Sequence, residues 1–284
     1  MKKASITAHL FTIVITLANA VCGIIAGLYL IKYALLRNTP GIFAEKYLTL
    51  VWVFALLGGI FDYLDGRIAR LTGTSSKFGV QLDSLCDAVT YGVIAALFIA
   101  VLNSFGTHPY WEKFSWFCAI VYLSGVLLRL ARYNVETRPE EKHHLKFRGL
   151  PSPAAAGMIA AIGVLFLGLR DGNILFTNIL WEIFSKGSVI QFSNYLIAAL
   201  PFIGLGLAFL MVSKIQYYHL HAFFRSLKGK KPFVYLAYIL IAFLLIAVFR
   251  EITLSLFGIS FFFYGLISYF YDLLTGKSKK SGKA

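Results

Sequence analysis

The sequence is poor in charge, and poorest in acidic residues. Only 14% of its 284 residues are charged, with 13 Asp or Glu against 27 Lys or Arg. Soluble domains carry about 25% charged residues, so this composition excludes an ordinary soluble globular domain. The hydrophobic fraction is 58% and the mean hydropathy is +0.74. Both values indicate an integral membrane protein.

Cysteine is also scarce. The three cysteines, Cys22, Cys86 and Cys118, all fall in apolar runs, and no CxxC spacing occurs. The sequence therefore indicates neither a disulfide framework nor a thiolate metal site. Buried thiols that behave as small hydrophobic groups are the simpler interpretation.

Strand alternation, internal repeats and low-complexity segments are absent. Lipid admits only helices or closed barrels, so we expect an all-α fold, a polytopic membrane helix bundle. The missing repeat gives no support to a repeat-built transporter. After Met1 the apolar run is too long for the short core of a cleavable signal peptide, so the first helix is expected to remain.

Long apolar runs approach the ~20 residues that span a bilayer as a helix. We expect about eight transmembrane helices, the first with an amphipathic N-terminal stretch, and we interpret residues 173–192 as an interfacial helix or loop. The predicted helices cover residues 6–36, 47–71, 76–101, 116–134, 151–169, 195–217, 232–249 and 252–274.

The net charge of +14 would suggest nucleic acid as a partner of a soluble protein. Here the basic residues gather in short loops and tails, so no nucleic-acid partner is expected. The expected partners are membrane lipid headgroups and phosphate-bearing substrates. Eight spans would place both termini and most basic residues on one side. The positive-inside rule makes that side cytoplasmic.

Four aspartates interrupt the apolar sequence at regular helical spacing. Asp62 and Asp65 are i, i+3, while Asp83 and Asp87 are i, i+4, so each pair shares one helical face. A short turn between the two helices makes them antiparallel neighbours, which brings the pairs together. Charge at such positions is costly in a membrane and marks a functional site. The same faces carry three small residues that leave room for a bulky group, namely Gly66, Ala69 and Gly79.

Four facing carboxylates could not all stay ionised without neutralising charge, and two divalent cations would supply it. An all-oxygen ligand set favours Mg²⁺ or Mn²⁺ over zinc. Two such ions can clamp the attacking and leaving oxygens of a displacement at phosphorus. Arg70 would add a fixed positive charge for phosphate oxygens. The alternatives are a cation pathway, or a buried network that pairs the acids with Arg67 and Arg70.

The spacing of this motif resembles the complete signature of the CDP-alcohol phosphotransferases. The matching pattern is Asp62-x2-Asp65-Gly66-x2-Ala69-Arg70-x8-Gly79-x3-Asp83-x3-Asp87. The resemblance implies that the four aspartates hold two metals on the pyrophosphate of a CDP-linked donor. It also implies that Gly66, Ala69 and Gly79 border the cytidine nucleotide, and that Asp87 is the general base for the acceptor hydroxyl.

A second block is similar to the phosphatidylserine synthase branch of that family. It comprises residues 128–135 and 147–155, with weaker support from Thr16-x2-Asn19-x2-Cys22-Gly23 and residues 210–215. By this resemblance Asn19 joins Gly66, Ala69, Arg70 and Gly79 in binding CDP and phosphate. One departure is that the usual Pro-Asn before Thr16 is replaced by Thr12-Ile13.

The second block also suggests how an amino-acid acceptor would be held. Arg129 and Arg132 lie i, i+3 at the end of a helix, where cations suit the helix dipole. The carboxylate of an amino acid needs such a partner, and Arg148 could complete the pocket. The alternative is that these arginines are topological anchors.

The resemblance implies transfer of a phosphatidyl group from CDP-diacylglycerol to the hydroxyl of L-serine, giving phosphatidylserine and CMP. It further implies a homodimer in the cell membrane with the site facing the cytoplasm. Another acceptor, such as inositol, glycerol 3-phosphate or choline, remains an alternative, and a divalent-cation transporter is a more distant one. We expect residues 1–217 to form the catalytic membrane domain. Residues 218–284 would add two helices and a basic tail.

Overall fold

The computed structural model describes residues 3–40, 44–73, 76–103, 109–136, 146–170, 182–213 and 216–218. Within them, six helical rods are long and apolar enough to cross a membrane. The helices predicted at 232–249 and 252–274 and the basic tail lie outside the described residues. The elements are α1 (Lys3–Leu36), α2 (Glu45–Thr72), α3 (Lys77–Asp87), the π-helix η1 (Ala88–Val93), α4 (Ile94–Asn103), α5 (Pro109–Glu136), β1 (Lys146–Arg148), α6 (Ser152–Arg170), α8 (Lys186–Val212) and β2 (Gln216–Tyr218).

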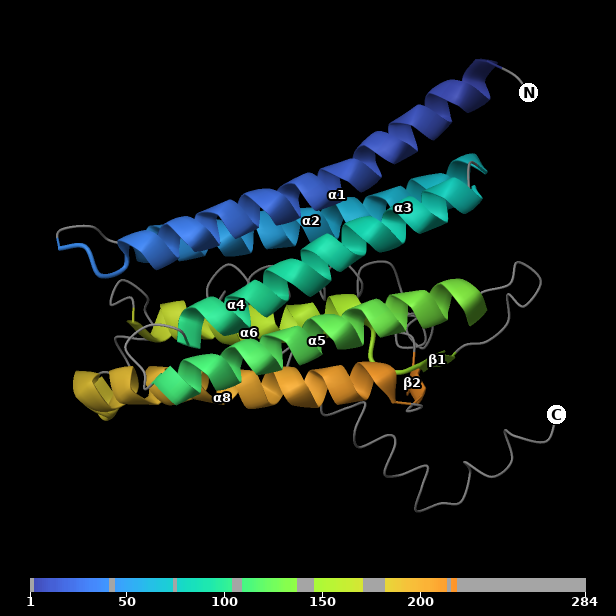
Figure 1. Cartoon of the computed structure of the whole chain (residues 1–284). Coiled ribbons are helices and arrows are strands. Elements are labelled where there is room, and N and C mark those ends of the chain that lie inside the picture. Colours follow the sequence, from blue (N-terminus) through green and yellow to red (C-terminus); the bar gives the residue numbers. More distant parts are fainter. Residues whose placement is uncertain are drawn as a thin grey trace, which may run out of the picture.

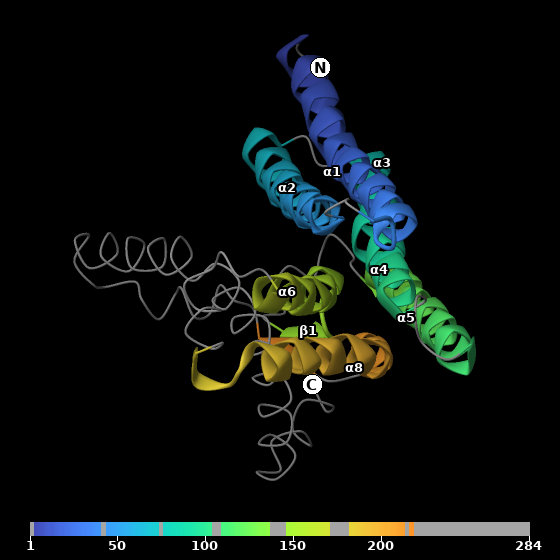
Figure 2. The same cartoon turned by 90° about the vertical axis from the view of Figure 1, so that its left-hand side faces the viewer.

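The rods form an up-and-down bundle (Figure 1). α1 packs along α2, and α3, η1 and α4 form one continuous rod that crosses beside α1. α8 packs against both α5 and α6 on the other side of the bundle (Figure 2). The start of α1, the end of α2 and the start of α3 therefore lie at one end, together with the end of α5 and the β1–β2 pair. The all-α prediction is confirmed, and the chain is an integral membrane protein.

Several predicted helix boundaries were wrong. The helix expected from 116 begins at Pro109, where proline suits a first turn because its missing N–H needs no partner. The helix expected from 195 begins at Lys186, after an N-cap at Ser185, whose side chain accepts a hydrogen bond from the Ser188 backbone N–H. Its first two turns are largely exposed and include the polar residues Lys186, Ser188 and Gln191, so the apolar pattern alone did not mark them.

The end of that helix was also misplaced. α8 stops at Val212 rather than 217, and Gln216–Tyr218 form strand β2, which pairs antiparallel with β1. Arg148 lies opposite Gln216 in this short ladder. Gly149 follows β1 with φ +83°, a conformation that favours glycine, and the Met211 carbonyl fills the space where a Cβ would lie.

The core joins the two halves of the bundle through aromatic packing. Trp52 of α2 meets Phe98 of α4 edge to face, with ring centroids 4.4 Å apart. Gly163 of α6 faces both rings so closely that a Cβ there would overlap the Trp52 ring. A small residue at this point therefore lets α6 reach α2 and α4, as small residues do in membrane bundles.

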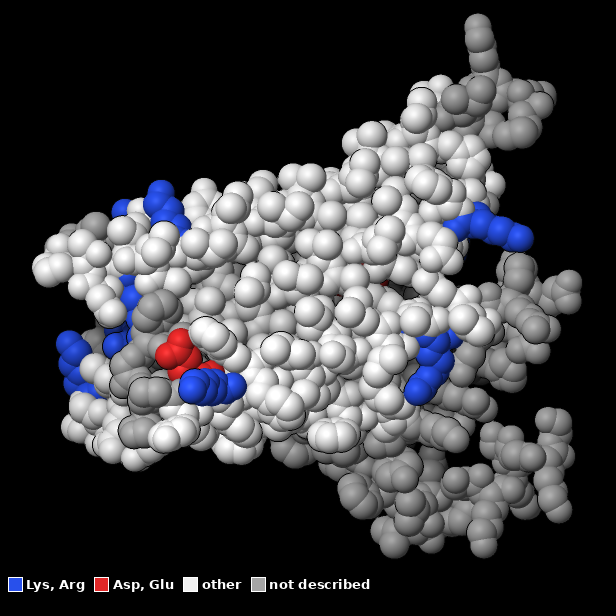
Figure 3. All heavy atoms as spheres, in the orientation of Figure 1, with Lys and Arg blue, Asp and Glu red and all other residues white. Residues whose placement is uncertain are grey.

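Charged side chains lie mainly near the two ends of the helices. In Figure 3 the described Lys and Arg residues flank a broad band without charge. Such a band is what a helix bundle presents to lipid hydrocarbon. The carboxylates of the acidic motif depart from this pattern because they lie inside the bundle, between helices.

Candidate active site

The acidic motif lies on α2 and α3, and the turn between them is set by local residues. α2 ends at Gly73, which adopts the left-handed conformation with φ +65°. Ser76 caps α3, and its hydroxyl accepts a 3.0 Å hydrogen bond from the Gly79 backbone N–H. The chain reverses direction at this turn, so α2 and α3 run antiparallel, but the expected direct packing between them is not found among the described residues: α1 packs against both helices instead.

Three of the four aspartates converge. Oxygen atoms of Asp62, Asp83 and Asp87 lie within 4.8 Å of one another, close enough to share a metal ion. Asp65 is the most deeply buried of the four, at 4% exposure, and it lines the same cavity as Asp83. The helical spacing thus brings three of the four expected carboxylates together, while Asp65 lines the neighbouring cavity.

Two of these carboxylates are held by neutral donors from other elements. The Tyr91 hydroxyl, in η1, donates a 2.8 Å hydrogen bond to Asp62 Oδ2. The Asn19 amide, in α1, donates a 3.3 Å hydrogen bond to Asp87 Oδ1. Neither donor carries charge, so the negative charge of the cluster is not neutralised by these contacts.

The other two carboxylates have bare oxygens. Asp65 Oδ2 and Asp83 Oδ1 are buried and have no hydrogen-bond partner among the described residues. An unpaired buried charge is costly. Hard, oxygen-only ligands of this kind suit divalent cations such as Mg²⁺. The acidic cluster therefore fits the divalent metals that the signature implies.

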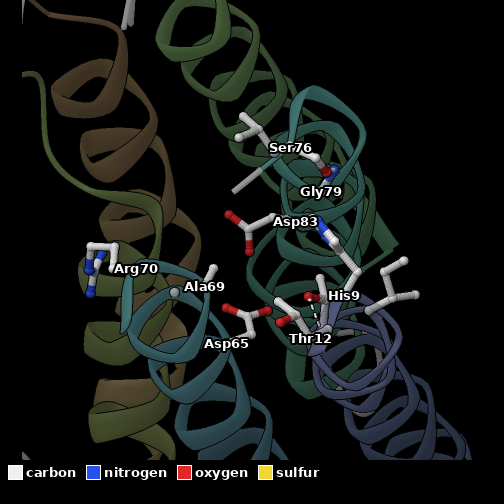
Figure 4. A pocket seen from close by; sticks show the side chains of 12 residues that line it. His9, Thr12, Asp65, Ala69, Arg70, Ser76, Gly79 and Asp83 are labelled. Carbon is white, nitrogen blue, oxygen red and sulfur yellow. Dashed lines mark hydrogen bonds between the residues drawn. The ribbon is translucent and has the colours of Figure 1, made fainter. Parts of the chain in front are cut away.

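A cavity of about 170 Å³ opens beside Asp65 and Asp83. Figure 4 shows the two carboxylates projecting into it from α2 and α3. The expected residues Gly66, Ala69, Arg70 and Gly79 line it. The full lining is His9, Thr12, Ile13, Thr16, Asp65, Gly66, Ala69, Arg70, Ser76, Gly79, Val80 and Asp83.

The glycines of the cavity keep its walls open. A Cβ at Gly66 would meet only the Arg70 guanidinium, at 3.7 Å, so Arg70 folds back along α2 over Gly66. A Cβ at Gly79 would press on the Ser76 hydroxyl at 3.2 Å. Arg70 is exposed, and in Figure 4 it points away from Asp65 and Asp83. The prediction that small residues leave space beside the acids is consistent with this geometry.

The sequence analysis noted Thr12, Ile13 and Thr16 on α1 but did not assign them, or His9, to the wall of the cavity. His9, Thr12, Ile13 and Thr16 follow the spacing i, i+3, i+4 and i+7, so they share one face. That polar face in an apolar helix was the available signal. Thr12 and Ile13 are the pair that replaces the family's Pro-Asn, so the departure lies in the wall of the cavity. Asn19, expected at the nucleotide, is not among the lining residues and instead contacts Asp87.

The three arginines of the second block differ in their surroundings. Arg129 donates a 2.7 Å hydrogen bond to Ser152, which is fully buried, while its Nε has no partner among the described residues. Its guanidinium also attracts the Asp87 carboxylate. Arg132 instead donates to the Val212 carbonyl at the end of α8, at 2.9 Å. Only the backbone of Arg148 is described.

Residues 10–190 match the sequence profile of the family described as CDP-alcohol phosphatidyltransferase. Curated proteins with similar sequences are named CDP-diacylglycerol–serine O-phosphatidyltransferase. One from Mycobacterium bovis is 36% identical over 168 residues, which cover 57% of this chain and 52% of that protein. One from Saccharomyces cerevisiae is 37% identical over 144 residues, 49% of each chain. One from Methanocaldococcus jannaschii is 35% identical over 116 residues, 41% of this chain and 51% of that protein. The chain thus spans about half the length of the curated relatives it matches.

Proposed function

Because the chain belongs to the CDP-alcohol phosphatidyltransferase family, we propose that it transfers a phosphatidyl group from CDP-diacylglycerol to the hydroxyl of L-serine. The products are phosphatidylserine and CMP. The observation that carries this proposal is the half-buried cluster of Asp62, Asp83 and Asp87 beside a cavity lined by Asp65. The names of the curated relatives support serine as the acceptor.

Asp62, Asp65, Asp83 and Asp87 would hold two divalent cations, Mg²⁺ or Mn²⁺. When bound, such ions polarise the pyrophosphate and stabilise the charge that develops on CMP. The bare oxygens of Asp65 and Asp83 support this assignment because each is a buried ligand atom with no hydrogen-bond partner in the described part of the chain. The hydrogen bonds to Asp62 and Asp87 keep those two carboxylates directed into the cluster.

The cavity between α1, α2 and α3 would receive the CDP part of the donor. Gly66, Ala69 and Gly79 allow the nucleotide to approach the backbone, and Arg70 lies at the rim for a phosphate oxygen. The acyl chains would remain in lipid between the helices. Asn19, which the resemblance assigns to CDP binding, would act on the donor site indirectly through Asp87.

Asp87 would act as the general base. It accepts the proton of the serine hydroxyl as that oxygen forms a bond to the phosphorus on the lipid side. The bond between this phosphorus and the CMP oxygen breaks, and CMP leaves. The Asn19 amide fixes the Asp87 carboxylate during this step.

Arg129 would bind the carboxylate of serine. Among the described residues its Nε has no hydrogen-bond partner, and Asp87 contributes to the electrostatic potential at its guanidinium, so a carboxylate held there would lie on the same side of the bundle as the base. A guanidinium and a carboxylate form strong, charge-assisted hydrogen bonds. Arg132 and Arg148 would add positive charge at the same end.

The catalytic membrane domain would comprise residues 1–217, which include the family match. Residues 218–284 would add two helices and a basic tail. We further propose a homodimer in the cell membrane with the cavity facing the cytoplasm, which supplies both CDP-linked lipid headgroups and serine.

The function is tested by incubating the purified protein and Mg²⁺ or Mn²⁺ with CDP-diacylglycerol and one acceptor at a time, following CMP. We expect release with serine and none with inositol, glycerol 3-phosphate or choline. Release with one of those alcohols alone would overturn serine as the acceptor. Cation flux into vesicles without donor lipid, and no CMP release, would favour a transporter instead.

Substitution of the aspartates gives the first prediction. We expect Asp87→Asn to lower CMP release about 100- to 10,000-fold, the usual contribution of a general base, and Asp83→Asn to have a loss of similar size. Glu45→Gln makes the same chemical change at the exposed start of α2, at the opposite end of the bundle, and should retain full activity. Full activity of either aspartate variant at saturating metal would contradict the assignment.

A further inference from the structure

The contact that holds Asp62 comes from a residue outside the acidic motif. Tyr91 is 7% exposed, and its hydroxyl donates the 2.8 Å hydrogen bond to Asp62 Oδ2. The two residues lie on different helical rods. Tyr91 follows Asp87 by four positions and lies in the element directly after α3.

Tyr91 is itself fixed by its position in η1. This π-helix runs from Ala88 to Val93 and interrupts the rod directly after Asp87. Tyr122 of α5, which is fully buried, donates a 3.1 Å hydrogen bond to the Tyr91 carbonyl. At the next residue, a Cβ on Gly92 would press on Leu123 at 3.0 Å, so η1 packs closely against α5. Short π-helical segments of this kind are frequent at functional sites.

The effect on Asp62 follows from hydrogen-bond chemistry. With one oxygen engaged by a fixed hydroxyl, the carboxylate cannot rotate away from Asp83 and Asp87. The phenol is neutral, so it orients Asp62 without supplying the positive charge that a Lys or Arg would supply. Groups that hydrogen-bond a metal ligand in this way typically change metal affinity 10- to 100-fold.

We propose that Tyr91 is a positioning residue that orients Asp62 for binding a divalent cation, and that η1 and Tyr122 hold Tyr91 in place. This inference rests on the proposed function only in that Asp62 is taken as a metal ligand. It does not depend on the acceptor or on the donor lipid.

The test is binding of Mn²⁺ alone to the purified full-length protein, followed by the electron paramagnetic resonance signal of free Mn²⁺. We expect Tyr91→Phe, which keeps the ring and removes the hydroxyl, to weaken Mn²⁺ binding 10-fold or more. Tyr63→Phe is the matched control, because Tyr63 is exposed beside Asp62 and its hydroxyl accepts a hydrogen bond from Arg67 instead. The Mn²⁺ affinity of Tyr63→Phe should equal that of the unmodified protein.

A double-mutant cycle separates positioning from a general structural effect. If Tyr91 acts through Asp62, Tyr91→Phe should change Mn²⁺ affinity less than twofold in an Asp62→Asn background. Tyr122→Phe, which leaves the Tyr91 hydroxyl in place, should weaken binding by an intermediate factor, and it provides a second test if Tyr91→Phe folds poorly. The proposal would be overturned if the Mn²⁺ affinity of Tyr91→Phe lies within twofold of that of the unmodified protein. It would also be overturned if Tyr91→Phe still weakens Mn²⁺ binding 10-fold in the Asp62→Asn background.

The outcome can be distinguished from failure of the proposed function. Serine-dependent CMP release by the unmodified protein tests the reaction, whereas Mn²⁺ binding tests Tyr91 independently of turnover. If the unmodified protein releases CMP but Tyr91→Phe binds Mn²⁺ equally well, the proposed function stands and the role of Tyr91 is refuted. An unmodified protein that binds no Mn²⁺ would overturn the role given to Asp62, and the inference with it.

Discussion

The four aspartates differ in how their oxygens are partnered, and Asp65 also accepts a side-chain hydrogen bond from Thr16. Asp62 and Asp87 each accept a hydrogen bond from a neutral side chain, while Asp65 and Asp83 each keep a buried oxygen without a partner among the described residues. A buried carboxylate held only by a neutral donor still requires a cation to balance its charge. The arrangement therefore combines fixed orientation with unneutralised charge, which is what a site that binds and releases a charged substrate requires.

Also at the residue scale, we expect substitutions of Arg129 and Arg132 to have different kinetic effects. We expect Arg129→Ala to raise the KM for serine about 10- to 100-fold, because a hydrogen bond to a charged group contributes about 1.5–3 kcal/mol. The KM for CDP-diacylglycerol should change little. The measurement is initial-rate kinetics with each substrate varied in turn.

Arg132→Ala is the comparison for that experiment. Its guanidinium already donates to the Val212 carbonyl, so its loss should lower thermal stability and raise the KM for serine less than threefold. An unchanged KM for serine in Arg129→Ala would exclude it from the acceptor pocket. An equal rise in both variants would contradict the division between them.

Individual site residues could be predicted where their spacing is local. Asp62 with Asp65, and Asp83 with Asp87, share faces because helical periodicity alone dictates it. Tyr91 and Ser152 could not be assigned, because their contacts join residues 29 and 23 positions apart, and only packing between helices determines them. Asn19 was expected at the nucleotide, and its contact with Asp87 could not be known without the packing of α1 against α3.

At the scale of elements, apolar length predicted about eight helices, six of which fall within the described residues, but it did not predict where the helix type changes within a rod. A π-helix inserts extra backbone within a continuous apolar run, so η1 leaves no signal in hydropathy. The polar first turns of α8 and the early start of α5 at Pro109 were missed for the opposite reason, since their residues resemble those of loops. The α1 wall of the cavity, from His9 to Thr16, was visible in the sequence as a polar face, but the sequence did not show which helices that face meets.

Helix packing gives a prediction at this scale. A Cβ at Gly163 would overlap the Trp52 ring and crowd Phe98, so Gly163→Ala should destabilise the bundle. Overpacking costs about 1–3 kcal/mol, against a gain of about 1 kcal/mol in helix propensity. The measurement is the unfolding temperature of the purified protein in detergent.

Gly157 supplies the matched control on the same helix. Of the described atoms, none lies within 4 Å of a Cβ built there, and the residue is exposed. Gly157→Ala should therefore leave the unfolding temperature unchanged or raise it. If Gly163→Ala is as stable as Gly157→Ala, close packing of α6 on α2 and α4 does not contribute to stability in the way described.

For the whole molecule, the cavity lies near one end of the bundle, where α2 turns into α3. Described basic residues occur at both ends, so the structure by itself does not orient the protein in the membrane. The two ends differ in the basic residues of the segments that connect the helices. The basic segment 138–148 joins the end of α5 to α6 at the end that holds the cavity, and residues 214–231, also rich in Lys and Arg, follow α8 there. The positive-inside rule then predicts that this end faces the cytoplasm.

Cysteine labelling in intact cells tests that orientation. Lys77 is exposed at the start of α3, at the end that holds the cavity, and Lys113 is exposed near the start of α5, at the other end. The native thiols Cys22, Cys86 and Cys118 are buried and should react slowly. We expect a membrane-impermeant maleimide to label Lys113→Cys in intact cells and Lys77→Cys only after the membrane is permeabilised. The reverse pattern would place the carboxylate cluster toward the outside, where the cytoplasm supplies neither CDP-linked donors nor free serine. That result would contradict the proposed reaction as well as the topology.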